Sequence, residues 1–499
     1  MPDSLKKEIG QGARVNALGV LGKLAGPAFF VLVIRLYGPD NFGVYVTALA
    51  LVEMALALLI AGFKDGAVIF IARYADEDRS NPRLYRALAN ALTWSLVLSV
   101  LLILAALTLG PRFLPELYPD FGSELAAMVS LMAPALPILA FERVVISATQ
   151  GLKIMKYEVI VNGMMRPLLL IAFASAAYGL LPDYRGLAAA YLATQVLIGL
   201  YTVFVFHREL VWRHLLRAFR DFEIDTEMIT FALPQNINAL FTRFVTNIDI
   251  LMLGMFGLSA GTTGLYAAGA MIVRELRQIK LVFSTSFAPH ISKLFENKEL
   301  DKLAHLFSTT VRWTTSLMIP AVLIVAALRN DLLSIAHPDF ADGSALFMIA
   351  LLPIPLLQGS LGFAGNVVVM SGFSRLNLYN SLAATTLNVV LNLFLIPLFG
   401  MAGAAIASTI SAALKTGVEF IQMRSILRIR PNFGEYFGPL AAGVPAAALM
   451  AAFFIFGWIP SDVLLGRAAI TLIAVAVFAG LLAFFAGGAP WKSQPSAHR

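Results

Sequence analysis

Apolar runs of about 20 residues or longer constrain the fold of this 499-residue chain more than any other feature. A helix of that length can cross the hydrocarbon core of a membrane. Of all residues, 59% are hydrophobic and 13% are charged, against about 45–50% and about 25% in soluble domains. The excess of hydrophobic residues falls in these runs. We predict an all-α polytopic membrane protein with about 14 transmembrane helices, at 15–36, 43–63, 87–110, 124–149, 159–181, 186–207, 228–256, 262–285, 307–328, 344–371, 376–399, 401–423, 435–458 and 463–486.

The lysines and arginines between these spans lie mostly on one side of the membrane. That side carries 23 of them, whereas the opposite side carries only Arg112, Arg185, Arg329 and Arg467. By the positive-inside rule the richer side is cytoplasmic, and an even number of spans then places both termini there.

Three short motifs recur in the same order at an offset of about 217 to 222 residues. They are Gly43-Val44-Tyr45 with Gly264-Leu265-Tyr266, Asn16-Ala17-Leu18 with Asn238-Ala239-Leu240, and Gly186–Ala190 with Gly403–Ala407. Such self-similarity indicates a duplication. Because each copy has six spans, we predict two parallel six-helix repeats with a site at their interface, plus two C-terminal helices. The predicted parts are an N-lobe at 1–207, a linker helix at 208–227, a C-lobe at 228–423, and helices 13 and 14 with a cytoplasmic tail at 424–499.

The linker between the two halves has the pattern of an amphipathic helix. One helical face carries its apolar residues, and the arginines lie mostly off that face: Val211, Trp212, Leu215, Leu216, Phe219 and Phe222 against Arg208, Arg213, Arg217 and Arg220. This pattern predicts a cytoplasmic helix in the headgroup region of an anionic leaflet. Recruitment of a partner protein is the alternative.

Two stretches resemble a known family. One is Tyr37-Gly38-Pro39 through Phe42-Gly43 and Tyr45, and the other runs from Ser371-Gly372-Phe373-Ser374-Arg375 through Asn388, Asn392 and Pro397 to Gly400 and Gly403-Ala404. Both are similar to bacterial polysaccharide and O-antigen flippases of the Wzx type. These belong to the multidrug/oligosaccharidyl-lipid/polysaccharide (MOP) exporter superfamily. The resemblance implies alternating access in the bacterial inner membrane and a cargo of oligosaccharide on an isoprenyl pyrophosphate. It also implies membrane lipids and, as candidate partners, a polysaccharide polymerase and chain-length machinery.

Ten lysines and arginines fall within the predicted spans, where a central charge costs about 2.5–3.5 kcal/mol unless a partner or water compensates it. We expect structural roles for Arg35, Lys280, Arg312 and Lys415, the last paired with Glu419 at i+4. The remaining six are Lys23, Arg143, Arg166, Arg243, Arg274 and Arg277.

Spans 1, 2, 7 and 8 concentrate charges of both signs. The duplication makes span 1 the counterpart of span 7, and span 2 the counterpart of span 8. This pattern suits a hydrated cavity that accepts an anion, and the resemblance implies a diphosphate, which arginine binds through its forked donors. The predicted substrate contacts are Lys23, Arg243 and Arg274, then Arg277 and Lys64, then Arg143 and Arg166, with Glu142 as a partner of Arg143. The candidates for proton or sodium coupling, or for charge pairing, are Glu53, Asp249 and Glu275. The alternative that the cations only lock helices by pairing these carboxylates stays open.

No feature of the sequence predicts catalysis, a metal site, a cofactor or nucleic-acid binding. Cysteine is absent, the six histidines show no His-Glu-x-x-His spacing, and no phosphate-binding P-loop occurs. One rival function is multidrug or cation antiport, which prefers an acidic, aromatic cavity. The other is a glycan polymerase or ligase, which needs a sizeable outer loop, whereas the longest predicted outer loops, 111–123 and 329–343, are short. The sequence leaves the glycan, the energy coupling and the assembly state undetermined.

Overall fold

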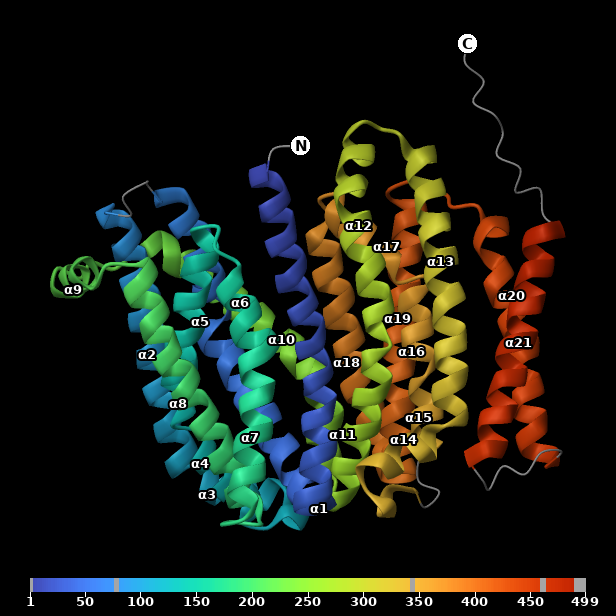
Figure 1. The fold of residues 1–499 in the computed structure, drawn as a ribbon, viewed down its shortest axis with the longest axis horizontal. Helices are drawn as coiled ribbons and strands as arrows, with labels where there is room; N and C mark the ends of the chain where they lie inside the picture. The colour runs from blue at the N-terminus through green and yellow to red at the C-terminus, as the bar shows by residue number, and fades with distance from the viewer. Residues whose placement is uncertain (1–2, 76–79, 342–345, 458–463, 489–499) are drawn as a thin grey trace. The chain divides into compact units, whose positions relative to one another are not determined.

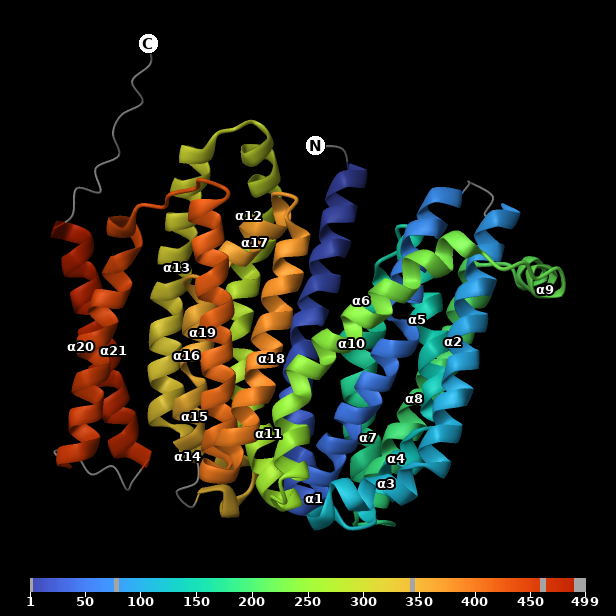
Figure 2. The same ribbon diagram turned by 180° about the vertical axis from the view of Figure 1, so that it is seen from behind.

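The computed structural model describes residues 3–75, 80–341, 346–457 and 464–488. These residues form helices and connecting loops, without a strand among them. They divide into two compact units, unit 1 with residues 1–267 and unit 2 with residues 268–499. Within each unit the long helices run side by side, as Figures 1 and 2 show from opposite directions.

Unit 1 holds α1 to α10 and the first half of α11. Aspartate or asparagine side chains cap three of them, since Asn81, Asp183 and Asp225 each accept a hydrogen bond from a backbone N–H of the first turn. The elements are α1 (Asp3–Tyr74), α2 (Pro82–Thr108), α3 (Gly110–Leu117), η1 (Pro119–Phe121), α4 (Glu124–Met132), α5 (Ala135–Gly151), α6 (Lys156–Ile160), the π-helical η2 (Val161–Met165), α7 (Arg166–Tyr178), α8 (Tyr184–Glu209), α9 (Trp212–Arg220), α10 (Thr226–Met255) and α11 (Ala260–Glu275).

Gly38 divides α1 into two helices. Its backbone has φ 82° and ψ 168°, a conformation that side chains other than hydrogen strongly disfavour. The break falls in the Tyr-Gly-Pro motif, between the predicted spans 15–36 and 43–63. α1 therefore contains two antiparallel stretches, and Figure 2 shows its chain turning back near the α1 label.

The two copies of the Gly-x-Tyr motif lie against each other within unit 1. A Cβ on Gly264 would come within 3.2 Å of the Gly43 Cα, and a Cβ on Gly43 would lie 1.7 Å from the carbonyl oxygen of Ala260. Glycine is therefore required at both positions by close approach of backbones. The predicted repeat and lobe boundaries themselves stay predictions.

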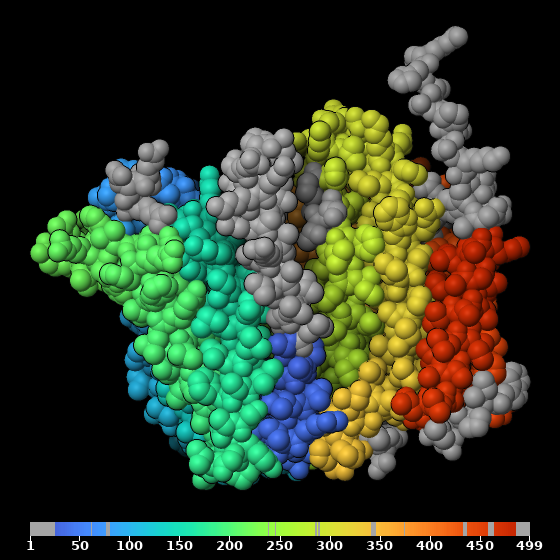
Figure 3. Space-filling view, in the orientation of Figure 1, coloured from blue at the N-terminus to red at the C-terminus, as the bar shows by residue number. Residues whose placement is uncertain are grey.

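Unit 2 begins with the end of α11, and its helices pack around α13 and α19. Figure 3 shows α13, in yellow, between α12 and the red pair α20 and α21, and all three of these helices pack against it. The elements are α12 (Arg277–Glu296), α13 (Leu300–Ala327), α14 (Arg329–Ala336), η3 (Pro338–Ala341), α15 (Leu346–Leu351), α16 (Pro353–Gly359), α17 (Phe363–Met370), α18 (Ser374–Phe399), α19 (Met401–Ser425), α20 (Phe433–Phe456) and α21 (Leu464–Gly488).

The described residues contain nine helices long and apolar enough to cross a membrane, or up to 12 if each bent pair counts as one span. The all-α polytopic fold is confirmed, whereas the predicted count of 14 is not. Two places explain the difference. The 50 residues of Ala25–Tyr74 count as one helix despite the break at Gly38, and the predicted span 262–285 is divided between the 16-residue α11 and α12, which carries four charged residues.

The predicted linker helix is present as α9, with the highest amphipathicity of the helices in unit 1. Leu215 is buried, the Trp212 ring lies 4.1 Å from that of Phe206, and Leu216 remains 61% exposed. In Figure 1, α9 runs across the directions of α2 and α8, at the end of the unit where α2 begins and α8 ends. This orientation fits a helix that lies along a membrane surface rather than across it.

Candidate functional site

Unit 1 encloses a cavity of about 310 Å³. Its walls come from α1, α5, the junction of η2 and α7, and α8, and each of these segments belongs to a helix or bent pair of membrane-crossing length. The lining is largely apolar and aromatic, and its charged members are Glu53, Arg143 and Arg166. Fixed cations inside a membrane-crossing bundle mark a candidate site for an anionic ligand.

Arg166 is held by three hydrogen bonds from its guanidinium group. It begins α7 directly after the π-helical turn Val161–Met165, a type of bulge that is frequent at functional sites. Nη2 donates to Glu142 Oε2 at 2.6 Å, Nη1 to Gln195 Oε1 at 2.6 Å, and Nε to Asn162 Oδ1 at 3.2 Å. Arg166 therefore ties α5 and α8 to its own helix, and most of its donors are already used.

Arg143 faces the same cavity with far fewer partners. Its side chain is 35% exposed, and its Nε lies 3.8 Å from Oε1 of the buried Glu142, too far for a hydrogen bond. Glu142 Oε1 and Gln195 Nε2 are also buried without a hydrogen-bond partner among the described residues. Buried polar atoms of this kind are usually satisfied by water or a ligand, so the site retains unused hydrogen-bonding capacity.

Glu53 and Arg243, which belong to the charged spans 2 and 7 of the sequence analysis, form an ion pair. Arg243 Nη1 donates to Glu53 Oε2 at 3.3 Å, and both side chains are more than a third exposed. Arg243 lies directly before the point where α10 bends by 58°, between Phe244 and Thr246. The pair joins the second half of α1 to this bend, and Glu53 extends it to the cavity wall.

The other predicted site residues of unit 1 lie in separate places. Lys64 Nζ is 3.6 Å from Asp65 Oδ1, at about half exposure for both residues. Asp249 accepts a 2.8 Å hydrogen bond from the Tyr266 hydroxyl, the tyrosine of the second motif copy. Lys23 belongs to α1, but its side chain lies outside the described residues.

Arg274, Glu275 and Arg277 surround the junction between α11 and α12 in unit 2. Arg274 is half-buried, whereas Glu275 and Arg277 are exposed. Neither arginine forms an ion pair within the described part of unit 2. Their predicted gathering around one substrate with the cations of unit 1 stays a prediction.

The predicted pair of Lys415 and Glu419 is confirmed at 3.8 Å, where Glu419 is buried and Lys415 is 37% exposed on its side chain. Lys280 lies on the neighbouring α12 and donates to the carbonyl of Gly362 at 3.0 Å. Lys280 and Lys415 thus each have a contact of the structural kind that we expected.

Sequence reasoning missed the uncharged part of the cavity. Asn162 and Gln195 orient Arg166, and Tyr45 and Tyr191 line the cavity while almost fully buried. Tyr45 belongs to the duplicated Gly-x-Tyr motif, so the repeat was a usable signal for it. The amides gave no such signal, because an asparagine or glutamine inside an apolar run does not reveal which helix face it occupies.

A family model described as "Polysaccharide biosynthesis protein" matches residues 9–295, more than half of the chain. The chain belongs to this family. The matched range includes unit 1 from residue 9 onward, with its cavity and the Glu53–Arg243 pair.

Curated relatives of this polysaccharide biosynthesis protein come from archaea. One is the probable flippase AglR of Haloferax volcanii, 24% identical over 81% of this chain and 81% of the relative. A probable low-salt glycan biosynthesis flippase of the same organism, Agl15, is 19% identical over 50% of this chain and 51% of its own.

Solved structures of MOP-superfamily exporters share the fold. The lipid II flippase MurJ, in an inward closed conformation, superimposes with a TM-score of 0.74, covering 95% of this chain and 99% of its own at 9% identity. An inward-facing multidrug transporter of the MATE family superimposes with a TM-score of 0.67, covering 82% and 94% at 16% identity. Family and fold together indicate a membrane transporter of the polysaccharide biosynthesis family rather than an enzyme.

Proposed function

We propose that this protein is a flippase that moves a lipid-linked oligosaccharide from the cytoplasmic to the outer leaflet for surface glycan synthesis. The observation that carries the proposal is the arginine-lined cavity of unit 1, in a chain of the polysaccharide biosynthesis family. The names of two archaeal relatives, both called probable flippases, support the proposal of a flippase.

The proposed cargo carries its oligosaccharide on an isoprenyl pyrophosphate. A diphosphate leaves the headgroup region only if fixed cations replace its counterions, and a guanidinium can do so with two parallel hydrogen bonds. Arg143 is the described cavity residue best suited to this role, because it lines the cavity and its donors have no hydrogen-bonded acceptor among the described residues. Arg243, Arg274 and Arg277, with Lys23 and Lys64, are proposed as further contacts along the path.

Alternating access supplies the proposed mechanism, with the isoprenyl tail remaining in lipid. A proton gradient, a sodium gradient or the membrane potential would drive it. Glu53 is the coupling candidate that lines the cavity, and Asp249 and Glu275 are the others. If Glu53→Gln leaves transport and its gradient dependence intact, Glu53 serves only to pair Arg243.

The deciding experiment measures the lipid-linked oligosaccharide pool and its sidedness in cells that lack this protein. We expect completed cargo to accumulate on the cytoplasmic face while surface glycan is lost. An unchanged pool with normal surface glycan refutes the flippase, and drug extrusion, the activity of an antiporter, becomes the next assay. Unpolymerised units accumulating on the outer face would indicate a polymerase instead. The three activities therefore give three different results.

Complementation by variants tests the cavity. Arg143→Gln removes a charge-assisted contact, typically worth about 1.5–3 kcal/mol, so flipping should fall by about tenfold or more. Arg185→Gln is the matched control, since Arg185 is an exposed arginine of the same unit, 3.9 Å from Asp183 and outside the cavity. Equal activity of both variants at wild-type level refutes the role of Arg143.

A further inference from the structure

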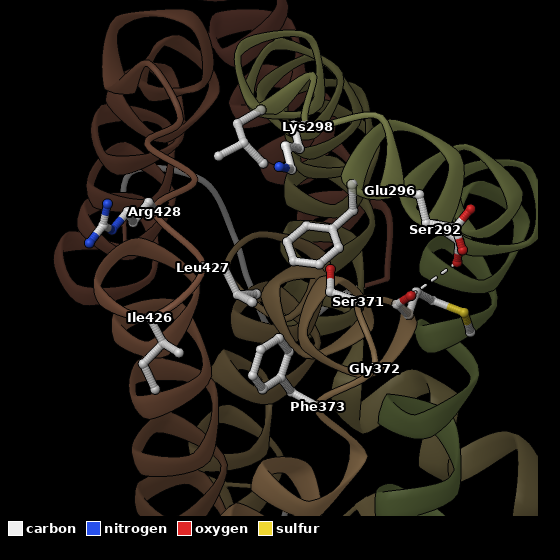
Figure 4. Close-up of a pocket in the computed structure, with 12 residues that line it drawn as sticks. Ser292, Glu296, Lys298, Ser371, Gly372, Phe373, Ile426, Leu427 and Arg428 are labelled. Carbon is white, nitrogen blue, oxygen red and sulfur yellow. Dashed lines mark hydrogen bonds between the residues drawn. The ribbon is translucent and has the colours of Figure 1, made fainter.

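Unit 2 has a second and larger cavity, of about 610 Å³, that the transport proposal does not use. The ends of three helices, α12, α17 and α19, converge on it, together with the start of α13 (Figure 4). It contains Ser371, Gly372 and Phe373, the first residues of the Ser-Gly-Phe-Ser-Arg motif. The motif therefore shapes a cavity wall as well as a turn.

The helix lengths place this cavity at the boundary of the hydrocarbon layer. Three helices here are long and apolar enough to cross a membrane. The span in α13 begins at Leu300, the span in α18 begins at Arg375, and the span in α19 ends at Ser425. Leu300 itself, Phe373 and Ile426 line the cavity. Because all three helices enter or leave the apolar layer here, the cavity lies at the depth of lipid headgroups.

A left-handed residue follows the end of each converging helix within three residues. Lys298 has φ 59°, Gly372 φ 91° and Arg428 φ 58°. Glycine adopts this conformation freely, whereas long side chains rarely do. The backbone thus turns at a lysine and an arginine, and both of them line the cavity.

The lining combines an apolar wall with cations and an unused hydroxyl. Phe295, Leu300, Met370, Phe373 and Leu427 supply the apolar surface. Lys298 and Arg428 form no ion pair among the described residues, and the buried Ser371 Oγ has no hydrogen-bond partner among them. By contrast, Ser292 Oγ donates to the Met370 carbonyl at 3.0 Å.

Figure 4 shows how these groups surround the cavity. Lys298 and Glu296 lie on one side, Arg428, Leu427 and Ile426 on the opposite side, and Phe373 at the base. Glu296 is the acidic member of the lining and offsets part of the positive charge. Lys298 and Arg428 thus lie on different sides of the cavity, and in this view the Arg428 guanidinium extends away from Lys298.

We propose that this cavity binds an anionic phospholipid, with its phosphate between Lys298 and Arg428 and an acyl chain along the wall that contains Phe373. Basic pockets between membrane helices are suited to anionic headgroups. A soluble phosphate would gain nothing from the apolar wall, whereas a lipid buries chain atoms there. Ser371 supplies one hydrogen bond to the phosphate or ester oxygens.

The test uses the full chain in detergent and native mass spectrometry with two probes, phosphatidylglycerol and phosphatidylcholine of equal chain length. We expect tighter binding of phosphatidylglycerol. A basic residue near an anionic headgroup contributes about fivefold in affinity, so Lys298→Gln and Arg428→Gln should each weaken phosphatidylglycerol about fivefold. Glu296→Gln should tighten the binding of phosphatidylglycerol, a change that a folding defect would not produce.

Lys302→Gln is the matched control, since Lys302 is an exposed lysine of the same loop region that pairs with Glu299 and does not line the cavity. The proposal is overturned if the two lipids bind equally, or if Lys302→Gln weakens binding as much as Lys298→Gln does. Competition between inorganic phosphate and the lipid is the last measurement. If millimolar phosphate displaces the lipid and binds equally tightly itself, the site is one for soluble phosphate and the lipid assignment is wrong.

Discussion

Adding one methyl group at Gly43 should open the contact between the two motif copies. The new Cβ would lie 1.7 Å from the carbonyl oxygen of Ala260, whereas a carbon–oxygen contact needs about 3.3 Å. The backbones must therefore separate by about 1.6 Å, and no flexible side chain can absorb the change. Overpacking of this kind costs about 1–3 kcal/mol, which corresponds to a shift of about 5- to 150-fold toward conformations in which the contact is open.

Maleimide labelling of a single cysteine measures this shift, because the natural chain contains no cysteine. Thr263→Cys reports on the contact, since Thr263 is fully buried beside Gly264. We expect Gly43→Ala to raise its labelling rate by about 5- to 150-fold. Ser99→Cys, which is fully buried in α2, should stay unlabelled and so exclude general unfolding. Gly417→Ala is the control, because nothing lies within 4 Å of its added methyl. An unchanged rate at Thr263→Cys would refute the reasoning.

Three further perturbations test the packing. Glu142→Ala leaves the half-buried Arg166 without its charge partner, so stability should fall by up to about 3–5 kcal/mol in thermal unfolding, and Glu142→Leu with Arg166→Met should recover most of the loss. Gly365→Ala brings a Cβ to 2.5 Å from the Glu419 carboxylate, and the drop in unfolding temperature should be smaller than for Gly43→Ala because a side-chain end can move. Burial raises the pKa of Tyr118, between α3 and η1, to about 12, so the Tyr118 contribution to stability should be constant below pH 10 and fall between about pH 10 and 12 by up to about 1.4 kcal/mol per pH unit. Tyr118→Phe should remove this part of the alkaline loss, and an identical pH profile would show that Tyr118 is not its source.

The features that follow from local chemistry were predictable. A glycine between Tyr37 and Pro39 marked the break in α1, and alternating apolar and basic segments marked the membrane-crossing helices. The pairing of Glu53 with a cation of α10 was the alternative that the sequence left open, because both residues lie among the charged spans 1, 2, 7 and 8. The predicted span 262–285 is not confirmed, since α12 combines apolar residues with charges and the preceding α11 is short.

The remaining parts of the site depend on geometry that no local pattern encodes. The π-helical turn before Arg166 changes the direction of that side chain relative to the rest of the helix, and its amide partners lie on its own helix and on α8. The unit 2 cavity arises because three helices end at one level, although their ends are far apart in the sequence. Spacing reveals each helix end but not their convergence.

Hydrogen-bond partners separate the arginines that lock helices from one that can bind a ligand. A cation at membrane depth costs about 2.5–3.5 kcal/mol, and each hydrogen bond to a charged group returns about 1.5–3 kcal/mol. Arg166, with three acceptors, is compensated within the protein, so an anion gains little by displacing them. Arg143 has a carboxylate at 3.8 Å and a partly exposed side chain, and water in the cavity must solvate the rest of its guanidinium group. An anion entering this cavity therefore replaces water at Arg143 rather than protein at Arg166, which makes Arg143 the residue whose loss should change transport without first changing the fold.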